Sequence, residues 1–529
     1  MIQLILSDRK FENDVYPLVK AFYPKETLKV SEGSRRLESE EPESLPQEEA
    51  VSVSPSQTDA LPDPGRDEGL TYAGVQGTYD RPDQVLLLFN EDGVELKLYS
   101  GNREVTAVKT ALEAFTDHKA AYKNGMKRVL YRLLSKFTKQ ELPWGILTGI
   151  RPTKLVYEML ERNLEEETIY QRMRSEYLCS DDKIGMSIRI AARERELLRE
   201  MDYRKGYSLY IGIPFCPTTC LYCSFTSYPL DRFADRVEAY LEALEKEIRY
   251  GATCLPGLKL TTVYIGGGTP TTLAAAQLDR LLGLVRASFD FTHVKEFCVE
   301  AGRPDSISKE KLEVLKKWGV SRISINPQSM QQRTLDLIGR RHTTEQIREA
   351  FRMARECGHD NINMDLIIGL PGETPADVRD TLDQIKDLYP EGLTVHTLAL
   401  KRAARLNTEK EAYAGLEAVE VAEMLEATIR FAKEHSYLPY YLYRQKNMSD
   451  NLENIGYSKY GKEGLYNILI MEEQQTILAL GAGAMSKFVF HEENRIERVD
   501  NVKSITDYIS RIDEMIAKKQ DFLQRNISL

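Results

Sequence analysis

The second half of the chain alternates between two hydrophobic periods. Short apolar runs, typical of buried strands, are separated by stretches in which apolar residues recur every three or four positions. In 231–250 the apolar side chains fall on one helical face, at Val237, Tyr240, Leu241, Leu244 and Ile248. The strand-like runs are 208–215, 261–266, 296–300, 322–328, 362–368 and 393–400.

Strands that alternate with helices predict a parallel sheet with right-handed crossovers, in an α/β fold. The pattern holds six such units, and a closed barrel of this kind needs eight. We therefore expect a partial six-unit (β/α) barrel, formed by residues 201–404. In α/β barrels the chemistry lies at the carboxyl ends of the strands.

Residues 1–200 carry a different pattern. Two strand-like runs, 83–89 and 93–99, flank the turn signal Asn90-Glu91-Asp92 and predict a hairpin. A long helical pattern then covers 104–138, interrupted near Asn124-Gly125, and more helix follows a break at 144–154. Together these segments predict a small α+β N-terminal domain.

One segment of that domain, 31–70, has the composition of a disordered insertion. It holds five prolines, eleven acidic and three basic residues and no aromatic residue. It therefore accounts for most of the net charge of −10. The remainder shows no basic stripe, so we expect no nucleic-acid partner.

Composition also restricts the compartment. No apolar stretch approaches the roughly 20 residues that span a bilayer, and the start lacks a basic leader with a cleavage site. Seven cysteines are an odd number in a long chain, which does not fit a disulfide framework. We expect a cytoplasmic protein with no membrane contact.

The last part of the chain, 405–529, is expected to be a smaller C-terminal domain that covers the substrate. It combines a helical stretch at 410–436, an aromatic cluster at 440–444 and a glycine-rich segment at 478–488.

Three of the cysteines lie within eight residues. Cys216, Cys220 and Cys223 have the spacing C-x3-C-x2-C directly after the first barrel strand. Thiolates are the usual ligands of iron–sulfur clusters, and most clusters use four. Three thiolates leave one iron free to bind a substrate group.

Zinc is the alternative metal for such a spacing. Structural zinc takes four ligands, often as two separated C-x2-C pairs, and no second pair exists here. His342 and His396 are the possible fourth ligands.

Polar and glycine residues follow the other strands at the same end of the predicted barrel. Gly266-Gly267-Gly268 follows the second strand, Glu300 ends the third and Gln328 ends the fourth. Asp365 lies within the fifth. Glycines at such a place let backbone groups approach a ligand closely.

These segments resemble a known family. LYIGIPFCPTTCLYC, IGGGTP, VEAGRPD, SINPQS and NMDLIIGLPGE resemble the oxygen-independent coproporphyrinogen III oxidases (dehydrogenases), which are radical S-adenosylmethionine (SAM) enzymes. WGILTGIRPTK, VHTL and YYLYRQKN resemble the long form of that family with an added N-terminal domain, the HemZ type.

The resemblance implies a 4Fe-4S cluster on Cys216, Cys220 and Cys223, and two SAM molecules. It also implies a set of residues that contact SAM, in which Tyr210 belongs to the catalytic group. By position these are Tyr210, Tyr222, Gly267, Gly268, Thr269, Glu300, Gln328, Arg340, Asp365, Ala399 and Met485.

The implied reaction belongs to haem biosynthesis. A SAM-derived radical abstracts a β-hydrogen from a propionate of coproporphyrinogen III, CO2 and an electron leave, and a vinyl group remains. Two rounds give protoporphyrinogen IX, with a low-potential donor such as flavodoxin or ferredoxin. Arg402 and Arg444 are candidate cations for the propionates.

Two features depart from the family pattern. Phe225 stands where the best-studied branch has a fourth cysteine. The haem-trafficking chaperones of this superfamily have the same aromatic substitution at that position. The segment 450–457 lacks the histidine and tryptophan of the chaperones' haem motif. The alternatives are a haem chaperone and a radical SAM enzyme acting on another tetrapyrrole, such as one that degrades haem anaerobically.

Overall fold

A computed structural model describes residues 1–34, 71–72, 81–101, 103–225, 227–399, 404–409, 413, 415, 420–444 and 452–526. The chain divides into two compact units, 1–188 and 189–529. The predicted insertion 31–70 lies outside the described residues from residue 35 onward. Its first two residues belong to strand β2 (Leu28–Glu32).

The first unit is built on a six-stranded sheet in the order β2-β1-β4-β5-β6-β3. Its strands besides β2 are β1 (Ile2–Leu6), β3 (Thr71–Tyr72), β4 (Gln84–Asn90), β5 (Gly93–Ser100) and β6 (Arg103–Ala111). Strands β4 and β5 pair antiparallel, which confirms the predicted hairpin. The helices of the unit are α1 (Glu12–Phe22), α2 (Lys119–Thr138), α3 (Thr153–Glu161), α4 (Glu166–Ser175) and the start of α5 (Asp181–Arg199).

The helix predicted over 104–138 is wrong in two respects. Residues 103–111 form β6, where β-branched Val105, Thr106 and Val108 are buried against the sheet. Helix α2 also runs through Asn124-Gly125 without a break. A Cβ at Gly125 would lie 2.7 Å from Leu112 Cδ2, so the glycine makes room for packing and does not end the helix.

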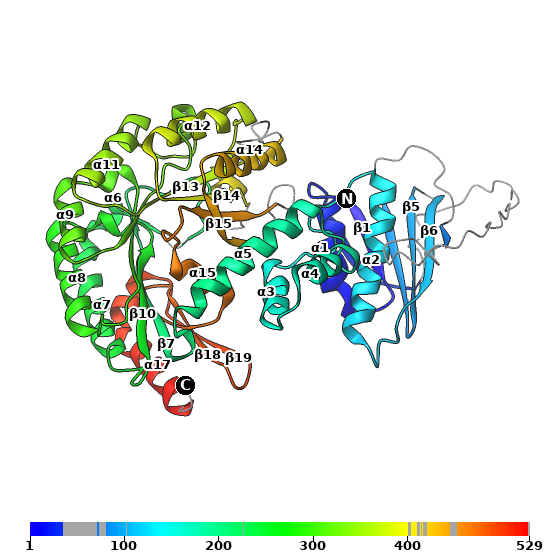
Figure 1. Cartoon of the computed structure of the whole chain (residues 1–529), viewed down its shortest axis with the longest axis horizontal. Helices are drawn as coiled ribbons and strands as arrows, with labels where there is room; N and C mark the ends of the chain where they lie inside the picture. The colour runs from blue at the N-terminus through cyan, green and yellow to red at the C-terminus, as the bar shows by residue number, and fades with distance from the viewer. Residues whose placement is uncertain are drawn as a thin grey trace, which may run out of the picture. The chain divides into compact units, whose positions relative to one another are not determined.

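The second unit contains the partial barrel that the pattern predicts. Six parallel strands lie side by side in chain order and are joined by helices (Figure 1). They are β7 (Gly206–Ile213), β10 (Lys259–Gly267), β11 (Glu296–Gly302), β12 (Arg322–Ile325), β13 (Ile362–Ile368) and β14 (Gly392–Thr397).

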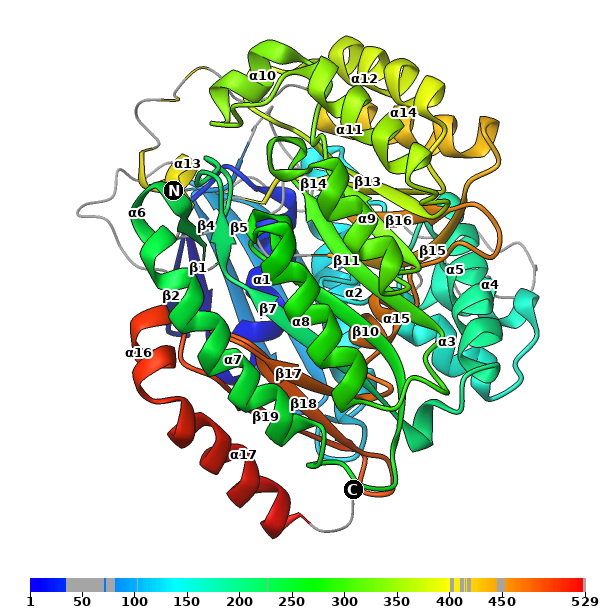
Figure 2. The same ribbon diagram turned by 90° about the vertical axis from the view of Figure 1, so that its left-hand side faces the viewer.

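The connecting helices cover the outer side of these strands (Figures 1 and 2). They are α7 (Val237–Gly251), α8 (Ala275–Ser288), α9 (Lys309–Lys317), α11 (Thr344–Glu356) and α12 (Pro375–Leu388). The predicted apolar face of α7 is buried as expected, with Val237, Tyr240 and Leu244 among its buried side chains. None of the helices in the described ranges is long and apolar enough to cross a membrane.

Segments after residue 404 widen this sheet at both edges. Strand β17 (Thr476–Leu480) pairs parallel with β7, and β18 (Met485–Phe490) and β19 (Arg495–Asp500) follow it antiparallel. At the other edge, β16 (Asn454–Ser458) and β15 (Leu438–Tyr443) continue from β14. All the strands after residue 404 named here belong to the same sheet as the barrel strands. The predicted domain boundaries near 200 and 404 stay predictions.

Candidate active site

A cavity of about 420 Å³ opens at the carboxyl ends of the barrel strands. It brings together thirteen of the predicted site residues: Cys216, Cys220, Cys223, Tyr210, Tyr222, Gly267, Gly268, Thr269, Glu300, Gln328, Arg340, Asp365 and Ala399. Met485 and Arg444 are not part of its described lining; Met485 is 48% exposed at the start of β18, and Arg444 is buried. Arg402 lies outside the described residues.

The cysteine loop leaves β7 and is held by one hydrogen bond to a neighbouring turn and by one within the loop. The Leu221 amide donates to the Ile338 carbonyl at 2.9 Å, and the Cys223 amide donates to the Cys220 carbonyl at 3.2 Å. Cys216 and Cys220 are buried, Cys223 is half-buried, and all three are free thiols.

The glycines after β10 make room for this loop. A Cβ at Gly268 would lie 2.5 Å from the Phe215 carbonyl oxygen and 2.9 Å from Cys216 Sγ. The Gly268 amide also donates to the Ile213 carbonyl at 2.8 Å. A glycine at 268 is therefore needed for the close approach of this turn to the first cysteine.

Burial favours the protonated form of two of the thiols, those of Cys216 and Cys223, in the metal-free protein. It raises the pKa of Cys216 to about 11, against a hydrogen bond from Thr269 that lowers it. Burial also raises the pKa of Cys223. A metal bound here has to displace these protons, as metals do when they bind thiols.

The donor set fits a cluster better than a single ion. Within the described ranges, no three His, Cys, Asp or Glu side chains meet around one ion position. Zinc needs its ligands at about 2.3 Å from one point, whereas each thiolate of a cluster binds its own iron. His342 does not line the cavity and His396 does, beside Asp365 rather than the thiols.

Glu300 is a half-buried acid of the cavity. The Tyr264 hydroxyl donates a hydrogen bond to its Oε1, and Gly266 leaves space for the carboxyl group, where a Cβ would lie 2.9 Å from it. Burial raises the pKa of Glu300 to about 7, although the hydrogen bond from Tyr264 lowers it. The group can therefore change charge near neutral pH.

Asp365 is held in its charged form. Burial raises the pKa of Asp365, but the opposing effect of His396 and Asn363 is larger, so the net shift of the pKa is downward. Asn363 Nδ2 donates to Asp365 Oδ1 at 2.7 Å, and His396 Nε2 lies 3.9 Å from Asp365 Oδ2. The cavity thus contains a carboxylate that keeps its negative charge, Asp365, together with a carboxyl group that can gain or lose its charge, Glu300.

Gln328 and Arg340 carry polar atoms that are not used within the protein. Gln328 has φ +68°, in the left-handed region, and its buried Oε1 has no hydrogen-bond partner among the described residues. Arg340 donates to the Asn326 carbonyl at 2.5 Å and to the Tyr222 hydroxyl at 3.2 Å, while its Nε stays unpartnered there. A buried orphan acceptor that lines a cavity fits a ligand with hydroxyl or amino donors.

Sequence reasoning missed several cavity residues: Tyr264, Arg303, Asn326 and His396. Tyr264 had a usable signal, because the strand period of two places it on the same face as Gly266. Arg303 follows Glu300 at the end of β11, in the strand-end zone that the barrel pattern marks. His396 was considered only as a zinc ligand.

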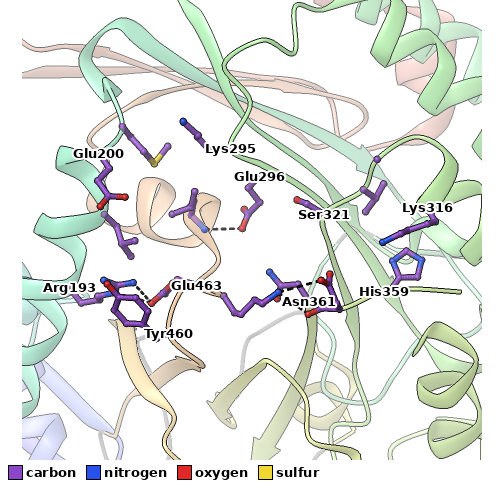
Figure 3. A pocket seen from close by; sticks show the side chains of 18 residues that line it. Arg193, Glu200, Lys295, Glu296, Lys316, Ser321, His359, Asn361, Tyr460 and Glu463 are labelled. Carbon is purple, nitrogen blue, oxygen red and sulfur yellow. Dashed lines mark hydrogen bonds and ion pairs between the residues drawn. The ribbon is translucent and has the colours of Figure 1, made fainter. Parts of the chain in front are cut away.

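A larger pocket of about 840 Å³ lies at the opposite, amino ends of the strands (Figure 3). Its charged groups are largely paired: Arg193 contacts Glu463 at 2.6 Å, and Glu296 accepts from the Leu465 amide at 2.9 Å. Barrel chemistry lies at the carboxyl ends, so the smaller cavity is the candidate active site.

The chain matches known proteins in sequence. The family model of the radical SAM superfamily matches residues 210–385. The "oxygen-independent coproporphyrinogen-III oxidase-like protein HemZ" of Bacillus subtilis is 44% identical over 407 residues, which cover 76% of this chain and 81% of that protein. The "heme chaperone HemW" of the same organism is 33% identical over 58% of this chain and 76% of its own length.

A solved structure, coproporphyrinogen III oxidase HemN of Escherichia coli, aligns with 61% of this chain and 73% of its own. The identity is 25% and the TM-score 0.48. The extent and identity of the match to HemZ decide the family. The chain belongs to the radical SAM superfamily and, within it, to the family of oxygen-independent coproporphyrinogen-III oxidase-like proteins.

Proposed function

We propose that this protein converts coproporphyrinogen III to protoporphyrinogen IX by oxygen-independent oxidative decarboxylation, in the cytoplasm. The observation that carries the proposal is the 44% identity to a coproporphyrinogen-III oxidase-like protein over 76% of the chain. The convergence of thirteen predicted residues on one cavity supports it.

Membership of the radical SAM superfamily implies a 4Fe-4S cluster and SAM. When bound and reduced by a low-potential donor such as flavodoxin or ferredoxin, the cluster supplies the electron that cleaves SAM. In our proposal the thiols of Cys216, Cys220 and Cys223 hold the cluster, and the cavity binds two SAM molecules.

The other cavity residues then bind and orient the ligands. The carboxylates of Glu300 and Asp365 face the cationic groups of SAM, and Gln328 Oε1 accepts a hydrogen bond from it. The backbone at Gly267 and Gly268 and the side chains of Tyr210, Tyr222, Thr269, Arg340 and Ala399 complete the binding surface. Met485 would join them only from outside the described cavity lining.

The substrate adds an apolar ring system with anionic arms. Phe225 lines the cavity and is 71% exposed, so it offers an apolar surface to the ring. We propose Arg402 and Arg444 as cations for the propionates, because charge-assisted hydrogen bonds to carboxylates contribute about 1.5–3 kcal/mol.

Anaerobic turnover tests the proposal directly. The reconstituted protein is mixed with coproporphyrinogen III, SAM and dithionite, and 5′-deoxyadenosine, CO2 and the vinyl product are quantified. We expect two CO2 for each protoporphyrinogen IX. Formation of 5′-deoxyadenosine without CO2 or a vinyl product contradicts the proposed substrate.

A haem chaperone is the second candidate, favoured by the identity to HemW and by the aromatic residue at 225. The same preparation is titrated with haem and then offered an apo-haemoprotein. Tight haem binding with transfer, and no turnover of coproporphyrinogen III, would establish the chaperone role in place of the oxidase.

A further inference from the structure

We propose that Arg303 is a positioning residue of the cluster: it fixes the cysteine loop and donates a charge-assisted hydrogen bond to the Cys220 thiolate, which makes the cluster easier to reduce. This inference rests on the cluster that the family implies, and not on the proposed tetrapyrrole substrate.

One nitrogen of the Arg303 guanidinium group, Nη1, contacts the cysteine loop. Its Nη1 donates to Thr218 Oγ1 at 2.7 Å and to the Thr218 carbonyl at 3.2 Å. The same nitrogen lies 3.8 Å from Cys220 Sγ, within hydrogen-bonding range for sulfur. Thr218 Oγ1 in turn donates to the Gly339 carbonyl at 3.0 Å, so the loop is held from both sides.

Asp305 fixes the orientation of the guanidinium group. Arg303 Nε donates to Asp305 Oδ1 at 2.9 Å and Nη2 donates to Oδ2 at 2.6 Å, a fork-to-fork pair. The pair leaves Nη1 directed at Thr218 and Cys220. His342 stands behind it, with Nδ1 3.8 Å from Asp305 Oδ1.

Burial gives this charge its effect. Arg303 is 3% exposed and lines the cavity with the three cysteines. If Arg303 served only in an ion pair, its contacts with Asp305 would be sufficient. Here the same guanidinium also reaches a cysteine 83 positions earlier in the chain.

The direction of the effect follows from charge. Reduction adds one negative charge to a cluster, and a buried cation or an N–H donor at a thiolate stabilises the reduced form more than the oxidised form. Arg303 should therefore raise the reduction potential, and Asp305 should partly offset it. Removing the charge of Arg303 should therefore lower the reduction potential, and removing the charge of Asp305 should raise it.

The test is an EPR-monitored redox titration of the reconstituted protein without SAM or tetrapyrrole. For Arg303→Gln we expect reduction to become about tenfold less favourable, which is a midpoint about 59 mV more negative. For Asp305→Asn we expect a more positive midpoint. Arg303→Lys keeps the charge and should fall between wild type and Arg303→Gln.

Arg355→Gln is the matched control, because Arg355 pairs with Glu391 at 2.8 Å through α11 and does not line the cavity. It should leave the midpoint unchanged. The midpoint potential is measured on the protein molecules that contain a cluster, and iron and sulfide are quantified. A variant with reduced cluster content therefore still gives a midpoint potential.

Unchanged midpoints in Arg303→Gln and Asp305→Asn, or shifts of both in the same direction, would overturn the inference and leave a purely structural ion pair. Opposite shifts in a protein that does not turn over coproporphyrinogen III would uphold the inference while the proposed substrate is rejected.

Discussion

At the residue scale, Glu300 shows how burial couples the site to pH. Its pKa is raised from 4.5 to about 7 by burial. Between those values the unfolded chain has released the proton and the folded protein keeps it, so stability falls as pH rises. For metal-free protein, we expect Glu300→Gln to remove part of the loss in unfolding free energy between pH 5 and pH 8. The difference should amount to about 3 kcal/mol, measured by urea unfolding.

The control for this measurement is Asp290→Asn. Asp290 is an exposed carboxyl whose pKa is lowered by hydrogen bonds from Thr292. Its contribution is complete above the unfolded pKa and is lost only at lower pH, so the slope between pH 5 and pH 8 should match wild type. If Glu300→Gln also matches wild type, the carboxyl is solvated in solution.

At the element scale, the C-terminal helix stabilises the strand that delivers the cysteines. Glu247 on α7 accepts from Lys519 Nζ on α17 (Ile512–Arg525) and from the Gly481 amide, both at 2.8 Å, and Lys519 and Glu247 are fully buried. The turn at Gly481 is joined to β7 through Tyr240, whose hydroxyl accepts from the Ala482 amide and donates to the Gly212 carbonyl.

Breaking this pair should be costly. Lys519→Met leaves the Glu247 carboxylate buried without its cation, and we expect a loss of about 3–5 kcal/mol in unfolding free energy. The double variant Glu247→Gln/Lys519→Met should recover part of it. Lys518→Met, which removes the neighbouring exposed pair with Asp500, should cost less than about 1 kcal/mol. Equal losses for Lys518→Met and Lys519→Met would contradict the buried network.

The same elements show what could be predicted from sequence. The six parallel strands and the cysteine loop follow from local periodicity and spacing, so they were accessible. Strand β17 was not, because it pairs with β7 through contacts such as Thr476 with Tyr207, far apart in the chain. The position of Arg303 at a strand end was accessible, but its contact with Thr218 was not, because the two residues lie 85 positions apart.

At the scale of the whole molecule, the candidate active site and most of the net negative charge lie in different parts of the chain. The described lining of the cavity runs from Tyr210 to Met471. Residues 35–70 hold ten acidic and three basic residues, which is seven of the ten net negative charges. We therefore expect turnover and cluster content to be independent of 35–70.

A replacement linker has to respect the sheet of the first unit. Strand β2 before the segment and β3 after it occupy opposite edges of six strands. With strands about 4.8 Å apart, the linker must cross roughly 24 Å. A Gly-Ser chain of about 20 residues reaches that distance. Replacing 35–70 with it should leave turnover within about twofold of wild type, because the acidic, proline-rich composition of the segment offers little apolar surface for packing.

A linker of about four residues is the informative contrast, since its extended length of about 14 Å cannot bridge the two edges. It should pull β3 from its pairing with β6 at Thr71 and Lys109 and lower the thermal midpoint of the first unit. Turnover lost with the long linker, at normal cluster content, would show that residues 35–70 take part in catalysis through substrate or donor binding.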